Sequence, residues 1–292
     1  MTPSCPNSLC SSFGSKEFIR KNGYFYRRWE SRKIARFICI KCKKSLSHAT
    51  GTLEYRQRKR RINRLFRDLL ASSVSMRRSA LILKVSRTTI DRKFIYLSRK
   101  ANLSQEEFLK SIKGTVTNVQ FDDLITIEHT KMKPVTVSLA VDKKKRFILG
   151  CEIGRIPAFG HLSKLSRKKY GYRLSEHQQC LDNLFKKITP TFSNAVMIES
   201  DEHSFYPPIV KKYAPDAEHI RHKGGRGCIV GQGELKKLGY DPLFTLNHSC
   251  AMLRANINRL VRKTWCTNKK LERIKMHLDI FIDFYNQVYL QR

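Results

Sequence analysis

Apolar and polar residues alternate in three consecutive segments near the middle of the chain, at 116–123, 135–142 and 146–154. Alternation with a period of two and a high content of β-branched residues predict three β-strands. The short basic linkers between them predict hairpin connections. The first strand is expected to end in Asp122 and Asp123, and a carboxylate at a strand end is either solvated or a ligand for a hard cation.

The pattern on the carboxyl side of these strands predicts further helices and strands. An apolar run at 194–201 predicts a buried strand that ends in Asp201, and 156–171, rich in Gly, Ser, Lys and Arg, predicts a loop over phosphates. The other predicted elements are helices at 176–188, 209–213, 245–264 and 271–285 and a strand at 218–221. Together they predict an α/β domain over 109–292 with a C-terminal helical part.

Before the strands, apolar residues recur at helical spacing from 62 to 70. Ser75 and Ser86 are then expected to cap two helices, 76–83 and 88–97, with a tight turn between them. This arrangement predicts a helix-turn-helix DNA-binding domain over 54–108, although a plain three-helix bundle would give the same pattern. The residues expected to face DNA are Arg87, Thr88, Thr89, Arg92 and Lys93.

Cysteine spacing defines the N-terminal segment, 1–53. Two close pairs, Cys5 with Cys10 and Cys39 with Cys42, are enough for a tetrahedral Zn²⁺ shell, and the aromatic-rich runs between them predict the hairpin of a zinc ribbon. A segment this short buries little core, so the metal would supply its folding free energy. The alternative is four unrelated buried thiols. The remaining cysteines are expected in the core: Cys151, Cys180, Cys228, Cys250 and Cys266.

The most informative feature of the composition is its net positive charge. The 292 residues include 58 Lys and Arg against 24 Asp and Glu, a formal net charge of +34 spread along the whole chain. Such an excess favours a polyanionic partner, because each neutralised phosphate releases counterions. We therefore expect double-stranded DNA as the partner, rather than a membrane or a small-molecule substrate. The chain holds no apolar run long enough to span a bilayer and no secretion signal, which predicts a cytoplasmic, nucleoid-associated bacterial protein.

Asp122 and Asp201 end two separate apolar strands of the predicted α/β domain. If the strands are neighbours, both carboxylates meet at one edge of the sheet. Two carboxylates and a third polar ligand from a helix suit a pair of Mg²⁺ (or Mn²⁺) ions for phosphoryl transfer. With a DNA-reading head, such a site predicts cleavage or joining of nucleic acid strands.

The chain resembles the DDE transposases of bacterial insertion sequences, in particular the first-described family of these elements. The similar segments are Cys39-x2-Cys42 with 47–52, Gln120-Phe-Asp-Asp123, Glu199-Ser-Asp201 with Tyr206, and 253–264. The resemblance implies an RNase H-like catalytic domain, with Asp122 and Asp201 as the first two catalytic carboxylates. It also implies binding of terminal inverted repeats through 1–102, strand cleavage and transfer, and a homo-oligomer. Basic residues of the last segment are expected to contact DNA: Arg254, Arg259, Arg262 and Lys263.

The third carboxylate departs from this family. The family carries a Glu shortly before its Leu-Arg pair, and aligning Leu253 and Arg254 with that pair puts Asn247 at the Glu position. A neutral amide oxygen is a weaker ligand than a carboxylate. Glu234 is the alternative ligand, although its Gly-rich setting predicts a loop. A site without a third ligand would suit a transposase-derived DNA-binding regulator with an inactive core, and an RNase H-like nuclease is a further alternative.

Overall fold

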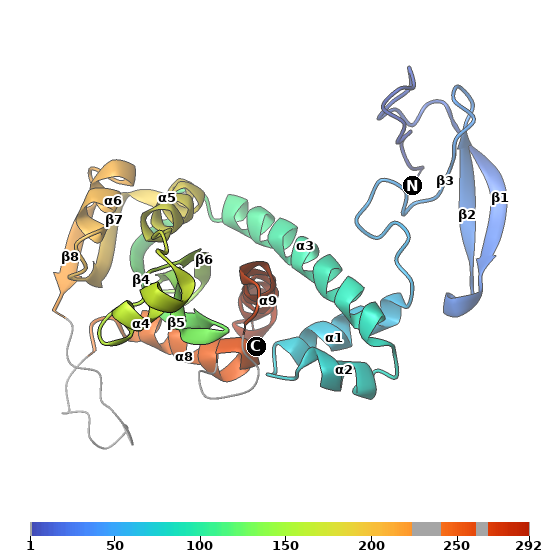
Figure 1. The fold of residues 1–292 in the computed structure, drawn as a ribbon. Helices are drawn as coiled ribbons and strands as arrows, with labels where there is room; N and C mark the ends of the chain where they lie inside the picture. The colour runs from blue at the N-terminus through green and yellow to red at the C-terminus, as the bar shows by residue number, and fades with distance from the viewer. Residues whose placement is uncertain (1, 224–240, 261–267, 292) are drawn as a thin grey trace. The chain divides into compact units, whose positions relative to one another are not determined.

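A computed structural model describes residues 2–223, 241–260 and 268–291. Its contacts divide the chain into two compact units, Met1–Leu65 and Phe66–Arg292 (Figure 1). The division of the chain into three domains at 53 and 108 stays a prediction. No helix within the described ranges is long and apolar enough to cross a membrane.

The first unit is built on a small antiparallel sheet in the order β1-β2-β3. Its strands are β1 (Ile19–Arg27), β2 (Arg32–Cys39) and β3 (Ser45–Leu46). The register of β1 against β2 shifts between Lys21 and Tyr24, where Gly23 has a positive φ of 69°. Ile19, Phe37 and Leu46 pack around the buried cysteines and complete a core of only a few side chains. The predicted hairpin is therefore present, with longer strands than expected.

Three helices open the second unit: α1 (Asn63–Leu70), α2 (Met76–Ile82) and α3 (Arg87–Ser111). Both predicted caps are present, because Ser75 Oγ accepts from the Arg78 N–H and Ser86 Oγ accepts from the Thr89 N–H. Helix α3 is far longer than predicted, since its apolar face continues onto α9 (Leu271–Phe284). Ile280 of α9 belongs to the same core as the three helices. The helices predicted to read DNA thus share a core with the end of the chain.

A five-stranded mixed sheet in the order β6-β5-β4-β7-β8 forms the centre of the second unit. Its strands are β4 (Val116–Glu128), β5 (Thr130–Asp142), β6 (Ile148–Arg155), β7 (Phe192–Asp201) and β8 (Glu218–His222). The chain direction is parallel from β4 to β7 and from β7 to β8, and antiparallel in the other two pairs. The two predicted hairpins and the strand ending in Asp201 are therefore confirmed.

The first predicted strand is wrong at its end. Strand β4 does not stop at the acid pair but continues to Glu128, so Asp122 and Asp123 lie in the middle of a strand. The alternation continues beyond the acids, with Leu124 and Thr126 both buried. The turn is made instead at His129, whose φ is 66°. Strand β5 consequently starts at Thr130, earlier than predicted.

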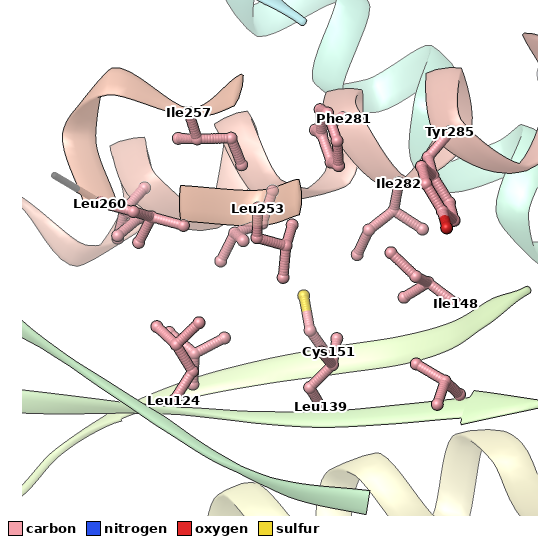
Figure 2. Close-up of a cluster of buried hydrophobic side chains, with 14 of the residues drawn as sticks. Leu124, Leu139, Ile148, Cys151, Leu253, Ile257, Leu260, Phe281, Ile282 and Tyr285 are labelled. Carbon is pink, nitrogen blue, oxygen red and sulfur yellow. The ribbon is translucent and has the colours of Figure 1, made fainter. Parts of the chain in front are cut away.

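Helices cover both faces of this sheet. On one face lie α5 (His177–Ile188) and α6 (Tyr206–Tyr213), which bury Phe121 and Leu149. On the other lie α8 (Phe244–Asn256) and α9, where Leu253 and Phe281 pack over Leu139 and Cys151 (Figure 2). At Gly154 a Cβ atom would clash with Cys180 Sγ of α5, so glycine permits the close approach of this helix.

Two further segments differ from prediction. The expected loop 156–171 contains α4 (Leu162–Tyr170), because Leu162 and Ser166 face β5 at helical spacing and the Ser166 hydroxyl donates to the Met132 carbonyl. The expected helix 245–264 ends at Asn256, followed by a 3₁₀ turn at Asn258–Leu260. The remainder of that predicted helix, from 261 onwards, lies outside the described residues.

Leu253→Ala tests the core between the sheet and α8. Leu253 is fully buried, so its truncation should lower the free energy of unfolding by about 2–5 kcal/mol through lost burial and a residual cavity. Leu103→Ala, at a half-exposed position on α3, should cost less than about 1 kcal/mol. Urea unfolding of both variants followed by far-UV circular dichroism gives the comparison. Equal losses in the two variants would contradict this packing.

Candidate active site and metal centre

The four N-terminal cysteines come together as predicted. Their Sγ atoms lie within 4.8 Å of one another, with Cys5 to Cys42 at 3.8 Å and Cys10 to Cys39 at 3.9 Å. A tetrahedral Zn²⁺ ion with Zn–S bonds of about 2.3 Å needs sulfur atoms about 3.8 Å apart. This group of thiols therefore fits a structural zinc ion without rearrangement.

Hydrogen bonds already favour thiolates in this cluster. The backbone N–H groups after Cys39, at Lys41 and Cys42, and the Ser12 hydroxyl lower the pKa of Cys39 to about 6. Ser12 also lowers the pKa of Cys10, whereas burial raises that of Cys5 to about 11. Donors aimed at sulfur support thiolate ligands, since the thiolate is the form that binds metal. The cysteine cluster is thus prepared for a cation.

Cys39→Ser tests the zinc site. Loss of one thiolate should reduce the zinc content from about one ion per chain to well below one and should unfold the first unit, because its small core depends on the metal. Metal analysis of the purified protein and limited proteolysis within 1–65 measure both effects. Cys250→Ser keeps all four thiols and should keep its zinc. A Cys39→Ser protein that retains a full ion would contradict this ligand set.

The register of β4 against β7 brings the two key aspartates together. Gln120 pairs with Glu199, and Asp122 and Asp201 each lie two residues further along their strands. A spacing of two keeps a side chain on the same face of the sheet. The negative charge of Asp201 acts on Asp122 and contributes to the rise in its pKa. The condition set by the sequence, that the two strands be neighbours, is therefore met.

Asp122 is held in one orientation. Its Oδ1 atom accepts from the Asp123 N–H at 2.7 Å and from the Tyr206 hydroxyl at 3.0 Å. Both hydrogen bonds of the carboxylate within the described residues fall on Oδ1, which leaves Oδ2 for another ligand. Burial, together with the charge of Asp201, raises the pKa of Asp122 to about 6. A bound cation would reverse this shift, because it favours the charged form.

Asp123 has the opposite character. Its carboxylate accepts hydrogen bonds from the hydroxyls of Thr136 and Ser138, shares the Tyr206 hydroxyl proton with Asp122, and pairs with His177 Nε2. Burial alone would raise the pKa of Asp123, but the His177 contact and the hydroxyl donors lower it. Through these contacts the carboxylate connects β4 to β5 and to the helices α5 and α6. It is less available to a metal than Asp122.

Asp201 lies at the end of β7, and its Oδ1 atom accepts from the His203 N–H at 2.9 Å. The His203 ring packs against the rings of His177 and Tyr206, with 5.1 Å between centroids in each case. A turn closed by its own aspartate fixes the carboxylate at the strand end. His203 therefore lies beside the side chains that contact Asp122 and Asp123.

The predicted third ligand lies in the first turns of α8. Asn247 is exposed, and its Nδ2 atom donates to Asp241 Oδ2 at 2.9 Å. Within the described residues no hydrogen bond joins it to Asp122 or Asp201. One turn further, burial, together with the negative charge of Asp122, raises the pKa of Cys250 to about 12. The alternative ligand, Glu234, lies outside the described residues.

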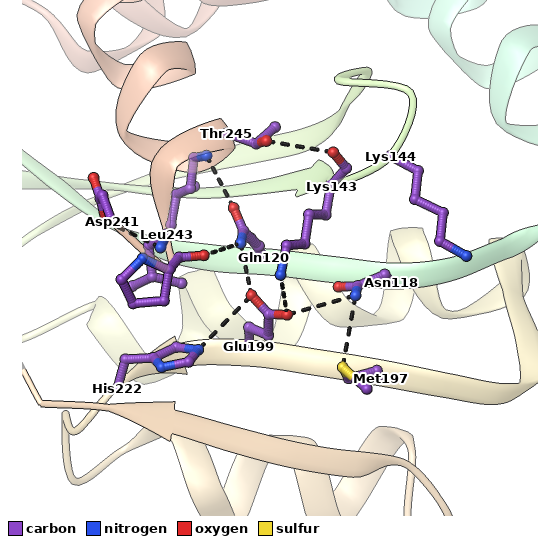
Figure 3. Close-up of polar contacts among 12 residues, drawn as sticks. Asn118, Gln120, Lys143, Lys144, Met197, Glu199, His222, Asp241, Leu243 and Thr245 are labelled. Atoms are coloured by element: carbon purple, nitrogen blue, oxygen red, sulfur yellow. Dashed lines mark hydrogen bonds and ion pairs between the residues drawn. The ribbon is translucent and has the colours of Figure 1, made fainter. Parts of the chain in front are cut away.

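A buried polar network that the sequence did not predict holds α8 on the sheet (Figure 3). Gln120 Nε2 donates to Glu199 Oε2 and to the Pro242 carbonyl, both at 2.7 Å, and Gln120 Oε1 accepts from the Leu246 N–H at 3.1 Å. Glu199, only 3% exposed, also pairs with Lys143 Nζ at 2.6 Å. The sequence did carry a signal for this network: Gln120 and Glu199 are polar residues two positions before Asp122 and Asp201, inside otherwise apolar strands.

The residues predicted to contact DNA differ in their exposure to solvent. Arg87, Thr88, Arg92 and Arg254 are exposed and Thr89 is half-buried. Lys93 differs from the expectation, because it is 4% exposed and lies against the Tyr96 ring. Arg259 packs on the Phe94 ring and on Met76 Sδ, so it joins the C-terminal segment to the helices. Arg262 and Lys263 lie outside the described residues, as do Cys228 and Cys266.

Comparison with known proteins finds similarity among solved structures. No family model matches the chain, and no curated protein matches it. Among solved structures, the chain is similar to the catalytic domain of the Mos1 mariner transposase, with 14% sequence identity and a TM-score of 0.30 over 65% of this chain and 85% of that one. The function is therefore inferred from this chain's own residues.

The raised pKa of Asp122 predicts how stability depends on pH. Between pH 4 and 6 the folded protein keeps a proton that the unfolded chain has lost, so stability falls as pH rises through this window. Asp122→Asn removes this loss. Its stability relative to wild type should increase from pH 4 to pH 7 by at most about 3 kcal/mol, at about 1.36 kcal/mol per pKa unit.

Urea unfolding in magnesium-free buffer at both pH values measures this difference. Asp182→Asn is the matched control, because Lys212 lowers the pKa of Asp182. Because Asp182 titrates below pH 4 in both the folded and the unfolded chain, that variant should keep a nearly constant stability relative to wild type between the two pH values. A relative stability of Asp122→Asn that is flat with pH would show that the carboxylate is not perturbed.

Proposed function

We propose that this protein is a DDE-type transposase of a bacterial insertion sequence, with an RNase H-like catalytic domain. The observation that carries the proposal is the parallel pairing of β4 with β7, which places Asp122 beside Asp201 under α8. The strand order, with two antiparallel hairpin pairs beside two parallel pairs, supports the RNase H-like assignment. The zinc ribbon and the capped helices α2 and α3 supply a DNA-binding part.

Asp122 and Asp201 would hold two Mg²⁺ or Mn²⁺ ions, with Asn247 as third ligand and Glu234 as its alternative. Ions bound there activate a hydroxyl nucleophile and stabilise the leaving oxygen of an in-line displacement. Tyr206 and the Asp123 N–H hold Oδ1 of Asp122, which would leave Oδ2 for a metal ion, while Asp201 is set by its turn with His203. The Asn247 amide bonds to Asp241 through Nδ2, so its carbonyl oxygen would be the atom offered to the same site.

The reaction would begin with hydrolysis at the end of the element. The freed 3′-hydroxyl would then attack a phosphate of target DNA, breaking one phosphodiester bond as it forms another. A net charge of +34 supports contact with long stretches of phosphate backbone. Residues 1–102 would bind the terminal inverted repeats, and a homo-oligomer would hold two ends together in the bacterial cytoplasm at the nucleoid.

One observation favours a second candidate, a DNA-binding regulator with an inactive core. The Asn247 side chain bonds to Asp241 instead of to the carboxylates. A neutral third ligand binds Mg²⁺ more weakly than a carboxylate does. A nuclease without strand transfer is the third candidate, and products joined to target DNA distinguish it from a transposase.

Cleavage of a labelled duplex that carries the element's end, with Mg²⁺ or Mn²⁺, tests the proposal. Wild type should nick the duplex, and Asp201→Ala should reduce nicking at least about 100-fold, because a metal ligand is lost. Asn247→Ala and Glu234→Ala are assayed in parallel, and the inactive one of these two identifies the third ligand. Joined products should appear with an added target plasmid.

Asp182→Asn, on the outer face of α5, is the matched control and should nick as wild type does. Wild type that binds the duplex without nicking it in either metal would replace the transposase by the regulator. Nicking that survives Asp201→Ala would show that the active site lies elsewhere.

A further inference from the structure

The segment around α4, between β6 and α5, exposes an unusual number of large apolar side chains. Phe159 is 61% and Tyr172 72% exposed. The other members are Leu165, Tyr170 and Leu174. Exposed large apolar groups gathered in one place mark interaction sites more often than single ones do. Figure 1 shows α4 beside β5, and the Ser166 hydroxyl fixes it there through the Met132 carbonyl at 2.7 Å.

The charges of this segment are of one sign. No Asp or Glu occurs from 156 to 175, whereas Lys164, Arg167, Lys168 and Lys169 are all exposed. Two of the rings carry a cation on one face. Lys133 Nζ lies 4.3 Å from the Tyr170 ring centre, and the Arg167 guanidinium lies 5.6 Å from the Tyr172 ring centre. An apolar protein surface that covered these rings would also have to desolvate the surrounding cations. A polyanion with flat apolar groups matches both the exposed rings and the positive charge.

A cavity of about 260 Å³ adjoins the same segment. Its apolar walls come from Ile125, Ile127 and Pro134 of the β4–β5 hairpin and from Phe159 and Leu162, with Lys131 at the side. This volume is close to the lower end for small-ligand pockets. Ile125 lies two positions, about 7 Å along an extended strand, beyond Asp123 and shares its face of the sheet, whereas Asp122 points to the other face. The cavity therefore lies on the Asp123 side of the sheet, a short distance along β4 from the carboxylates.

We propose that the surface formed by 159–174 with Lys131 and Lys133, the α4 surface, binds unpaired nucleotides of a DNA strand next to the active site. One base would enter the cavity against Phe159, and neighbouring bases would stack on Tyr172 and Tyr170. Phosphates would meet the lysines and arginines of α4. Aromatic platforms in a basic groove bind single strands in this way without reading sequence. The proposal rests on the proposed function only for the origin of the unpaired strand.

Fluorescence anisotropy with a 20-nucleotide oligothymidylate and a 20-base-pair duplex tests the surface. Phe159→Ala with Tyr172→Ala should weaken oligothymidylate binding by at least about fivefold per ring, the lower range for a lost base–aromatic stack. Duplex binding should change less than twofold. Tyr289→Ala, another half-exposed tyrosine of the second unit, is the matched control and should leave both affinities unchanged.

The salt dependence separates stacking from charge. The aromatic double variant should keep the slope of log affinity against log salt, because no phosphate contact is lost. Lys168→Gln with Lys169→Gln should reduce the slope by about 0.7 for each lysine that contacts the single strand. Oligothymidylate affinity that is unchanged in the aromatic variant, or reduced equally in Tyr289→Ala, would overturn the proposal.

The two proposals fail independently. If wild type never nicks DNA but the aromatic variant selectively loses oligothymidylate, the α4 surface stands and the transposase does not. If wild type nicks the duplex and the aromatic variant binds the single strand normally, the surface is wrong and the catalytic proposal is untouched. A 5-iodouridine placed beside the cut site should crosslink to a peptide from 159–174, and a crosslink confined to other segments would also reject the surface.

Discussion

The parallel pairing of β4 with β7 is the constraint on which the site depends. Side chains alternate between faces, so a slip of one residue would move Asp201 to the face opposite Asp122. Val119 and Ile198, paired across the two strands and fully buried, oppose such a slip by burial. Gln120 and Glu199 oppose it by a hydrogen bond, since a shifted Glu199 would leave a buried charge without its partner.

Gln120 has a second role, because its amide also bonds to the start of α8. The Leu246 N–H belongs to the first turn of that helix, where backbone donors have no partner within the helix. One side chain therefore sets both the strand register and the position of the helix that carries Asn247. Lys143, from the turn between β5 and β6, completes the charge balance of Glu199 and attaches the outer hairpin to the same network.

The sequence predicted those elements whose side-chain periods were unambiguous. The prediction that Ser75 and Ser86 cap helices is confirmed, because a hydroxyl just before an apolar helical pattern can accept a hydrogen bond from a backbone N–H of the first turn. The strand ending in Asp201 was correct because its apolar run is continuous. The predicted end of β4 was wrong because the acid pair was taken for the end of the strand, although alternation persists to Glu128. The helix α4 was missed because Lys, Ser and Arg dominate its composition, and its contacts with β5 decide its state.

Within the site, the aspartates could be predicted but their different environments could not. Asp122 and Asp123 are adjacent in sequence and chemically identical. Their neighbours come from β5, α5 and α6, which no local pattern connects to β4. His177 and the hydroxyls of Thr136 and Ser138 lower the pKa of Asp123, while burial beside Asp201 raises that of Asp122. Tertiary contacts thus give each carboxylate its own role.

The raised pKa of Asp122 affects how this carboxylate would interact with a cation. A carboxylate whose pKa is raised to about 6 is destabilised in its charged form, and a cation between Asp122 and Asp201 removes that destabilisation. Neutralising the pair with a fixed arginine would also lower the pKa, but it would occupy Oδ2 and exclude a metal. The chain has 58 basic residues, so the fold must keep all of their side chains away from Asp122. Tyr206, a neutral donor, orients the carboxylate without cancelling its charge, and so would preserve its attraction for the proposed divalent ion.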